Sequence, residues 1–241
     1  MKRYRREDEN SYALGITLTF ELLKFAPKQA RKIYIHSKMQ EGESLDRLKE
    51  LAGSLRVPVE YGDKPFNILS QKENCFCIGE FEKFNRPLSK DASHVVLHNP
   101  SNAGNLGTIM RSATGFGIKD LAIIRPSVDE FDVKTVRASM GAVFHLNIQL
   151  FDTFEDYLKE YGNRNLYPFM LKGRKNLSEL EFEKPYSLIF GNEATGLPDS
   201  FLEVGTGVVI SHSDNIDSLN LPIAASIALY AATRKDFGKG D

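Results

Sequence analysis

Three polar loops after residue 98 carry the side chains whose types suit chemistry. They are Asn99 to Gly107, Gly191 to Pro198 and Ser211 to Ser218. Each follows a short apolar, partly β-branched run that predicts a strand. Because α/β sheets bind ligands beyond the carboxyl ends of their strands, the sequence predicts a ligand site where these loops meet.

Each loop contributes one side chain with two possible roles. Arg111, on the helix predicted after the first loop, can hold a phosphate or form an ordinary surface ion pair. Glu193 lies between Gly191 and Gly196 at the mouth of an apolar strand, where its carboxylate is either functional or part of an exposed turn. Asn220 precedes an Ala-rich helix, either as its N-cap alone or also as part of a site for an anionic or carbonyl ligand.

Several familiar site patterns are missing from the sequence. The first loop is not a dinucleotide fingerprint, because no G-x-G-x-x-G follows the strand, and no phosphate-binding P-loop is present. Cys75 and Cys77 have no Cys or His partner at metal-ligand spacing. The sequence therefore predicts no metal site, and the sparse cysteines indicate a reducing compartment.

Strands and helices are predicted to alternate regularly after residue 93. The expected strands are 94–98, 120–125, 144–150, 166–171, 186–190 and 207–211. The expected helices are 105–115, 131–140, 153–161, 198–203 and 219–235. This alternation predicts an α/β fold with a mostly parallel sheet and helices on both faces.

The first part of the chain predicts a smaller α/β domain. Residues 1–10 are charged throughout and predict a loose basic arm. Helices at 14–25 and 45–55, with strands at 32–36, 58–61 and 75–80, predict a small helix-covered sheet. A polar linker at 86–92 then separates a domain over 1–85 from one over 93–241.

Positive charge gathers near the N-terminus, although the whole chain has 31 basic and 32 acidic residues. The first 40 residues hold nine Lys or Arg and only four acids. This distribution suits a phosphate-rich partner, and an ordinary solvated surface remains the alternative. No apolar run reaches the roughly 18 to 20 residues of a membrane span. The charged N-terminus is unlike a signal peptide, so we expect a cytoplasmic protein without membrane contact.

Taken in order, the three loops resemble the motifs of one family. The segments Asn105-x-Gly107-x-x-x-Arg111, Leu188 to Leu197, and Ile210 through Asp217-Ser218-Leu219-Asn220 resemble motifs 1, 2 and 3 of the SpoU-type RNA 2′-O-ribose methyltransferases of the SPOUT superfamily. The first domain looks like the small ribosomal-protein-like RNA-binding domain often fused to them.

The resemblance implies a fold, a cofactor and a set of site residues. The implied fold ends in a deep trefoil knot, which sequence reasoning alone excludes because chains rarely thread. The implied cofactor is S-adenosylmethionine, and the implied substrate is tRNA or rRNA. The cofactor positions carried over are Gly191, Asn192, Ile210, Ser218 and Leu219. The catalytic positions carried over are Asn105, Arg111, Glu193, Ser218 and Asn220. No metal is implied.

The roles within this set follow from chemistry and from the resemblance. A guanidinium rarely loses its proton, so Arg111 is expected to bind a phosphate and stabilise a developing alkoxide. Glu193 is expected to orient Arg111 or Asn105. Ile210 and Leu219 would sandwich the adenine. The family acts as a homodimer that pairs the knotted regions, and the Ala-rich helix offers an apolar surface for this pairing.

Two other functions compete with this interpretation. One is a SPOUT enzyme that methylates a base, and the other is a non-catalytic RNA-binding protein that uses the knot only as a dimer scaffold. Motif 3 also departs from the family, because Ser211-His212-Ser213 follows Ile210 and Leu221-Pro222 follows Asn220. These departures affect the base assignment and the fit of the substrate.

Overall fold

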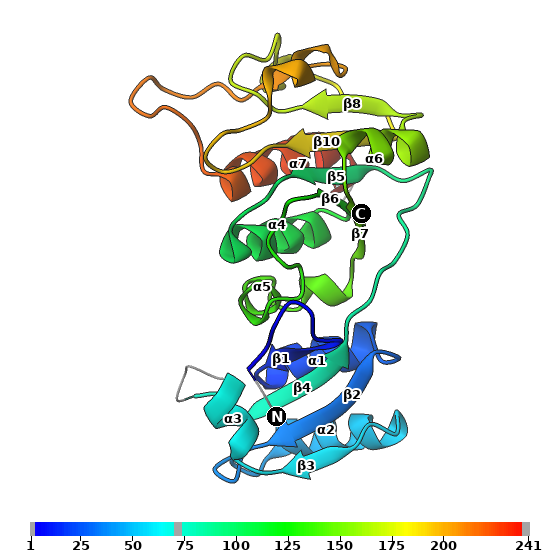
Figure 1. Ribbon diagram of the computed structural model, residues 1–241, viewed down its shortest axis with the longest axis vertical. Helices are drawn as coiled ribbons and strands as arrows, with labels where there is room; N and C mark the ends of the chain where they lie inside the picture. Colours follow the sequence, from blue (N-terminus) through cyan, green and yellow to red (C-terminus); the bar gives the residue numbers. More distant parts are fainter. Residues whose placement is uncertain (1–2, 70–73, 238–241) are drawn as a thin grey trace. The chain divides into compact units, whose positions relative to one another are not determined.

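The computed structural model describes residues 3–69 and 74–237 and divides into two compact units (Figure 1). Unit 1 comprises Met1–Phe84 with Asp129–His145. Unit 2 comprises Asn85–Val128 with Leu146–Asp241. By its contacts, the segment 129–145 thus belongs with unit 1, whereas the boundaries expected from the sequence place it in the second domain.

Unit 1 is built on a mixed four-stranded sheet in the order β1-β4-β2-β3. Its strands are β1 (Asn10–Leu14), β2 (Ala30–Ile35), β3 (Val59–Tyr61) and β4 (Cys77–Glu82). Its helices are α1 (Ile16–Phe25), α2 (Glu43–Ser54), α3 (Lys64–Leu69), α5 (Val133–Ala138) and the 3-10 turn η1 (Ala142–Phe144). Leu23 of α1, Leu45 of α2 and Ile33 of β2 share one buried cluster. The predicted small helix-covered sheet is confirmed.

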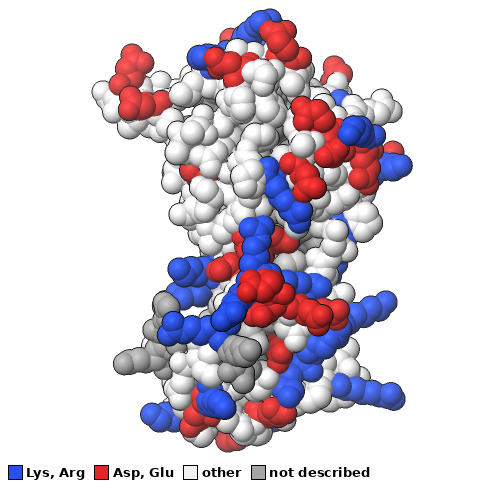
Figure 2. Space-filling model, in the orientation of Figure 1, with Lys and Arg blue, Asp and Glu red and all other residues white. Residues whose placement is uncertain are grey.

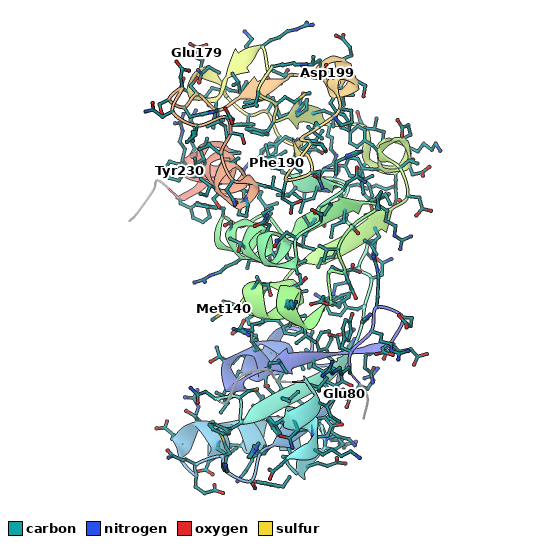
Figure 3. The ribbon with its side chains drawn as sticks, turned by 60° about the vertical axis from the view of Figure 1, so that its left-hand side comes forward. Glu80, Met140, Glu179, Phe190, Asp199 and Tyr230 are labelled. Atoms are coloured by element: carbon teal, nitrogen blue, oxygen red, sulfur yellow. The ribbon has the colours of Figure 1, made fainter. Side chains whose placement is uncertain are left out.

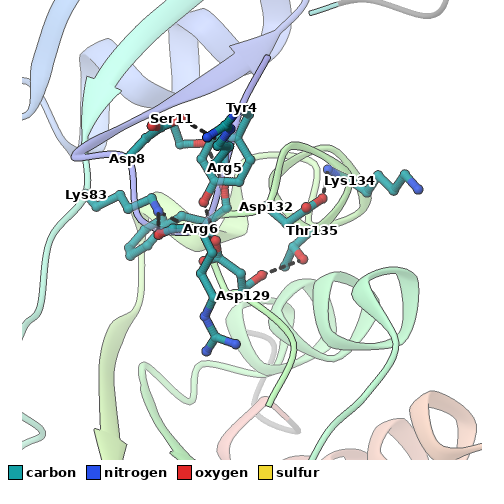
Figure 4. A network of polar contacts seen from close by, with 11 residues as sticks. Tyr4, Arg5, Arg6, Asp8, Ser11, Lys83, Asp129, Asp132, Lys134 and Thr135 are labelled. Carbon is teal, nitrogen blue, oxygen red and sulfur yellow. Dashed lines mark hydrogen bonds and ion pairs between the residues drawn. The ribbon is translucent and has the colours of Figure 1, made fainter. Parts of the chain in front are cut away.

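The N-terminal arm is held in place, so the prediction of a loose arm is wrong for its described part; residues 1–2 lie outside that part. The Tyr4 hydroxyl donates a hydrogen bond to the Asp129 carboxylate (Figure 4). The Lys83 ammonium donates to the carbonyl of Arg6 at 2.7 Å. The charged sequence of the arm has no apolar periodicity, so its pattern does not predict these contacts. They are made by the Tyr4 side chain and by the backbone carbonyl of Arg6.

The segment 129–145 packs on the sheet of unit 1 through aromatic rings. Phe131 lies edge-on to Phe81 with ring centroids 5.9 Å apart, and Phe144 lies edge-on to the same ring at 5.0 Å. The Ser11 hydroxyl donates to the carbonyl of Phe131 at 2.5 Å. These buried contacts explain why the segment groups with β1 and α1 rather than with its neighbours in sequence.

Unit 2 is built on a five-stranded sheet in the order β7-β6-β5-β10-β8, in which every neighbouring pair is parallel. Its strands are β5 (His94–His98), β6 (Asp120–Ile124), β7 (Asn147–Phe151), β8 (Asn165–Pro168) and β10 (Tyr186–Phe190). A two-stranded sheet pairs β9 (Lys175–Asn176) with β11 (Val208–Val209). The helices are α4 (Ala103–Gly115), α6 (Phe154–Tyr161), α7 (Leu221–Phe237) and the 3-10 turns η2 (Leu177–Glu179) and η3 (Asp199–Glu203). The parallel α/β sheet predicted from the sequence is confirmed.

The central strands are apolar because both faces of the sheet are covered. Val96, Ala122 and Ile189 pack with residues of α6 in one buried cluster. Helix α7 packs against α4 and β10 (Figure 1). A sheet buried on both faces opens to ligands only at its edges, and its carboxyl edge carries the polar loops that follow β5 and β10. The third polar loop follows β11 of the two-stranded sheet.

Element boundaries differ from the predicted ones for local reasons. The strand expected at 144–150 begins only at Asn147, because Gly141 adopts a left-handed φ of 90° and starts the 3-10 turn η1. The strand expected at 207–211 shortens to β11, whose partner β9 has only two residues. Among the described residues, no helix is long and apolar enough to cross a membrane.

Candidate active site

The carboxylate of Glu193 joins the loops that follow β5 and β10. Its Oε2 accepts hydrogen bonds from the N–H and the hydroxyl of Ser101 at 3.0 and 2.7 Å. Its Oε1 accepts from the N–H of Asn102 at 3.1 Å and from the Asn105 amide at 3.2 Å. We call these four residues the Glu193 cluster. The structure thus brings Glu193 and Asn105, two of the predicted catalytic residues, into direct contact.

The hydrogen bonds decide the charge of Glu193. Partial burial raises its pKa, but the hydrogen bonds from Ser101 and Asn105 act in the opposite direction, and the pKa ends below its ordinary value. A carboxylate that accepts several hydrogen bonds stays ionised at neutral pH. Glu193 is therefore a weak proton acceptor and a good anchor for neighbouring donors.

The first loop is shaped by asparagines. The Asn102 side chain caps α4 by accepting from the Asn105 N–H at 3.0 Å, so the helix begins at Ala103. The Asn192 amide donates to the carbonyl of Asn99 at 2.8 Å, and Asn99 adopts a left-handed φ of 56°. The loops after β5 and β10 are therefore held together at two points, here and in the Glu193 cluster.

Arg111 lies on α4, and its side chain is exposed. No hydrogen bond or ion pair joins it to any residue in the described part of the chain. Of the two partners expected for Glu193, the structure shows Asn105 and not Arg111. The guanidinium is accordingly available to an external anion.

A cavity of 380 Å³ opens between the loops that follow β8, β10 and β11. All five residues predicted to hold the cofactor line it, together with Glu193. These residues are Gly191, Asn192, Glu193, Ile210, Ser218 and Leu219. Asn105, Arg111 and Asn220 are absent from the described lining. The cavity and the Glu193 cluster thus share Glu193 as their common residue.

Gly191 is required by the tight turn of the second loop. A Cβ at this position would lie 2.1 Å from the carbonyl carbon of Gly196. Asn192 and Gly196 exchange backbone hydrogen bonds of 3.2 and 2.9 Å, and Gly196 has a left-handed φ of 67°. A side chain at position 191 would therefore clash with the backbone of the same loop, which lines the cavity.

The third loop supplies the last predicted residues. The carbonyl of Asn220 accepts from the N–H groups of Ile223 and Ala224 at 3.0 Å each, so Asn220 occupies the N-cap position as predicted. His212 donates from Nδ1 to the carbonyl of Ile210 at 2.9 Å and lines the cavity. Among the described residues, no group of three or more His, Cys, Asp or Glu side chains is arranged to hold a metal ion.

Sequence reasoning missed the wall of the cavity that follows β8. Phe169 stacks on Phe190 with ring centroids 4.7 Å apart, and Met170, Leu171 and Lys172 follow it along the lining. Asp199, from η3, also lines the cavity. The signal that could have identified this wall was the expected strand at 166–171. A parallel strand next to β10 ends at the same edge of the sheet, so the residues that follow it lie near the site.

A family model and curated relatives match the part of the chain that carries this site. Residues 92–230 match the model described as the SpoU rRNA Methylase family. A protein of Synechocystis sp. named as an uncharacterized tRNA/rRNA methyltransferase is 31% identical over 146 residues, which are 59% of this chain and 53% of that relative. A putative tRNA (cytidine(34)-2′-O)-methyltransferase of Listeria innocua is 30% identical over 149 residues, covering 59% of this chain and 88% of the relative.

Solved structures match both units. The AdoMet-bound rRNA methyltransferase from Sinorhizobium meliloti is similar with a TM-score of 0.80 and 25% identity, covering 94% of this chain and 88% of that one. The SpoU methyltransferase AviRb from Streptomyces viridochromogenes in complex with AdoMet matches in fold, with a TM-score of 0.80, 20% identity and 96% and 92% coverage. The structural likeness thus extends beyond the segment matched by sequence.

Proposed function

We propose that this chain, which belongs to the SpoU rRNA methylase family, is an S-adenosylmethionine-dependent RNA 2′-O-ribose methyltransferase that acts on structured tRNA or rRNA at the Glu193 cluster. One observation carries the proposal of the site. Glu193 bonds the Asn105 amide at 3.2 Å and at the same time lines the cavity that contains all five predicted cofactor positions.

The residues around the cavity fit S-adenosylmethionine. Its 380 Å³ falls within the roughly 300 to 1,000 Å³ of small-molecule sites. Ile210 and Leu219 supply apolar surface for the adenine, and the turn at Gly191 offers backbone groups to the ribose. When bound, the cofactor supplies a methyl group on a sulfonium. The chain must then hold the acceptor oxygen in line and help its proton leave.

Asn105 and Glu193 position the acceptor. The ionised Glu193 is a poor base because its pKa is lowered and its oxygens already accept five hydrogen bonds. It fixes the Asn105 side chain, whose other polar atoms face the acceptor ribose. Ser218 and Asn220 shape the third loop, where Ser218 lines the cavity and Asn220 starts α7.

Arg111 binds the phosphate next to the acceptor ribose. Its guanidinium is exposed and can make two parallel hydrogen bonds to a phosphate. The same positive charge stabilises the alkoxide as the 2′-hydroxyl passes its proton to solvent water. The role requires the planar guanidinium and not merely a positive charge.

Unit 1 contacts the RNA through its basic surface. Lys and Arg side chains gather over this unit in Figure 2, and Arg3, Arg5, Lys24, Lys28 and Lys38 are exposed. Some of its charge is neutralised internally, since Lys32 pairs with Glu60 at 2.7 Å. Salt-sensitive, sequence-independent binding is the behaviour this surface supports.

We also propose that the chain threads its C-terminal segment into a knot and forms a homodimer in the cytoplasm, where the RNA is modified. Ile223, Ile227 and Tyr230 of α7 are 53%, 38% and 58% exposed. Their spacing of four and three residues places them on one helix face. An exposed apolar stripe of this kind supports pairing of two copies through α7.

Isothermal titration of the purified protein with S-adenosylmethionine tests the proposed site. We expect saturable binding that weakens when Leu219 is changed to Asp, which puts an uncompensated charge into the apolar wall. Asp217→Asn, in the same loop and outside the described lining, is the matched control. Absence of binding by the wild-type protein would favour the non-catalytic RNA-binding alternative.

A further inference from the structure

The cavity has a charged rim that the proposed chemistry does not use. Three formally charged side chains line the cavity, namely Lys172, Glu193 and Asp199. Glu193 is already committed to the donors of its cluster. Lys172 and Asp199 instead bond to each other, with Lys172 Nζ at 2.9 and 2.7 Å from the two carboxylate oxygens of Asp199.

The backbone on the Lys172 side is fixed, so the ion pair has a defined place. Gly173 lies against the backbone of Val208, where a Cβ would be 2.4 Å from the carbonyl carbon. The Met170 N–H donates to the carbonyl of Val208 at 2.9 Å. These contacts hold the loop that carries Lys172 against the segment that forms β11.

Asp199 is held from the other side of the rim. It is the first residue of η3, directly after Pro198, and Phe201 of the same turn is buried. Figure 3 labels Asp199 together with Phe190, the last residue of β10 and another lining residue of the cavity. The two charges therefore face each other from two separate, anchored segments.

The ion pair itself contributes little to folding. The Lys172 and Asp199 side chains are 66% and 69% exposed, and solvent screens such pairs. Exchange of partners is therefore easy. A ligand that carries both a carboxylate and an ammonium can replace each half of the pair with a new opposite charge.

We propose that Lys172 and Asp199 bind the amino-acid tail of S-adenosylmethionine, Lys172 the α-carboxylate and Asp199 the α-ammonium. The inference rests on the proposed cofactor site. It makes the pair a specificity element that separates the full cofactor from nucleosides without an amino-acid tail. Glu193, the remaining charged side chain of the described lining, is already engaged in the Glu193 cluster.

A second ion pair provides the control. Arg174 and Glu203 join the same two segments at 3.4 Å, are 76% and 80% exposed, and are not part of the described lining. If ion pairing merely ties these segments together, removing either pair has the same effect. If the rim binds the amino-acid tail, only removal of the Lys172–Asp199 pair lowers the affinity for a ligand that has the tail.

The test is calorimetric titration with S-adenosylhomocysteine, which has the tail, and with 5′-methylthioadenosine, which lacks it. For Lys172→Met and Asp199→Asn we expect affinity for S-adenosylhomocysteine to fall about fivefold to twentyfold, as for a lost charged hydrogen bond at an exposed site. Affinity for 5′-methylthioadenosine should stay within about twofold, because the nucleoside does not reach the rim. Arg174→Met and Glu203→Gln should change neither affinity.

Two outcomes would overturn the proposal. Equal losses for both ligands would place the pair against the nucleoside, and unchanged affinities for both would remove it from the site. Failure of the wild-type protein to bind either ligand is a different result, which contradicts the proposed cofactor site itself.

Discussion

Two carboxylate networks hold distant parts of this chain together, and they differ in what they leave open. In unit 1, Asp129 bonds Tyr4 and lies 3.5 Å from the Lys83 ammonium; we call these three residues the Asp129 cluster. Its charges balance, and the side chains of Asp129 and Lys83 are only 10% and 18% exposed. In unit 2, the partners of Glu193 are all neutral donors. The first network is closed and the second is open to a ligand.

The pKa of Glu193, in the open network, and that of Glu130, next to the closed one, are shifted in opposite directions. Hydrogen bonds from Ser101 and Asn105 outweigh burial and lower the pKa of Glu193. Burial raises the pKa of Glu130, next to Asp129, and the Asp129 charge raises it further. The difference shows that hydrogen-bond donors can outweigh burial in setting the pKa of a carboxyl group, and so keep it ionised in a site. The open network is therefore suited to hold reacting groups, and the closed network to hold the chain.

The largest expected effect concerns Arg111, an exposed charge on α4, the helix that also carries Asn105. We expect Arg111→Ala to lower the methyl-transfer rate by about 100-fold to 1,000-fold, as for loss of one group that stabilises a developing oxyanion. Arg111→Lys should recover only a small part of this, because lysine lacks the planar guanidinium. Single-turnover kinetics with radiolabelled cofactor measures both, and full activity of Arg111→Lys would contradict the bidentate role.

The second prediction compares the two carboxylates directly. Glu193→Gln should slow methyl transfer by about 100-fold, because displacement of Asn105 by even 1 Å misaligns the acceptor. Asp129→Asn should leave the rate within about threefold but lower the free energy of unfolding by about 2 kcal/mol, since Lys83 loses its buried partner. Kinetics and urea unfolding on the same two proteins give all four values. If both variants showed the same change in methyl-transfer rate and in free energy of unfolding, the distinction between the two networks would be contradicted.

The third prediction probes how the arm is held. Tyr4→Phe removes the hydrogen bond to Asp129 but keeps the ring, over which the Lys83 ammonium lies at 4.7 Å from the centroid. We expect the free energy of unfolding to fall by about 1 kcal/mol. Chemical denaturation at neutral pH measures the loss. An unchanged midpoint would mean that the arm does not depend on the Asp129 cluster.

The smallest expected effect is the opposite pH dependence of two glutamates. Glu193 has a lowered folded pKa, so its charge stabilises the fold above the ordinary value of about 4.3 and this contribution is lost as pH falls through the folded pKa. Glu130 has a raised folded pKa, so its ionisation destabilises the fold as pH rises above the same ordinary value.

Accordingly, at pH 7 Glu193→Gln should lower stability and Glu130→Gln should raise it. Both differences should shrink toward pH 4, where the unfolded carboxyls are largely protonated. Denaturant midpoints across this range measure the effect. Shifts of the same sign in both variants would contradict the contrast between the networks.

Much of unit 2 could be predicted because its pattern is local. The apolar runs that became β5, β6 and β10 are short, buried on both faces and separated by helical segments, so their positions follow from periodicity. Because the strands are parallel, the loops at their carboxyl ends lie at the same edge of the sheet. The contact between Glu193 and Asn105 follows from the same geometry, because β5 and β10 are neighbours in the sheet.

The rest depended on contacts between residues far apart in sequence. The Tyr4 contact with Asp129 spans 125 positions, and no local pattern in a charged arm indicates it. Lys172 and Asp199 were overlooked for the same reason, since each is an ordinary exposed charge until β8 and η3 meet at the cavity. Strand β9 has two residues, too few to produce any alternation.

The most direct test of the central claim is the identity of the methylated atom. Purified protein is incubated with isotopically labelled S-adenosylmethionine and bulk tRNA and rRNA from a strain that lacks the gene, and the nucleosides are analysed by mass spectrometry. The account predicts label on a ribose, recovered as a 2′-O-methylnucleoside within an alkali-resistant dinucleotide, and incorporation about 100-fold to 1,000-fold slower with Arg111→Ala. Label on a base, or incorporation at the wild-type rate in that variant, would contradict it.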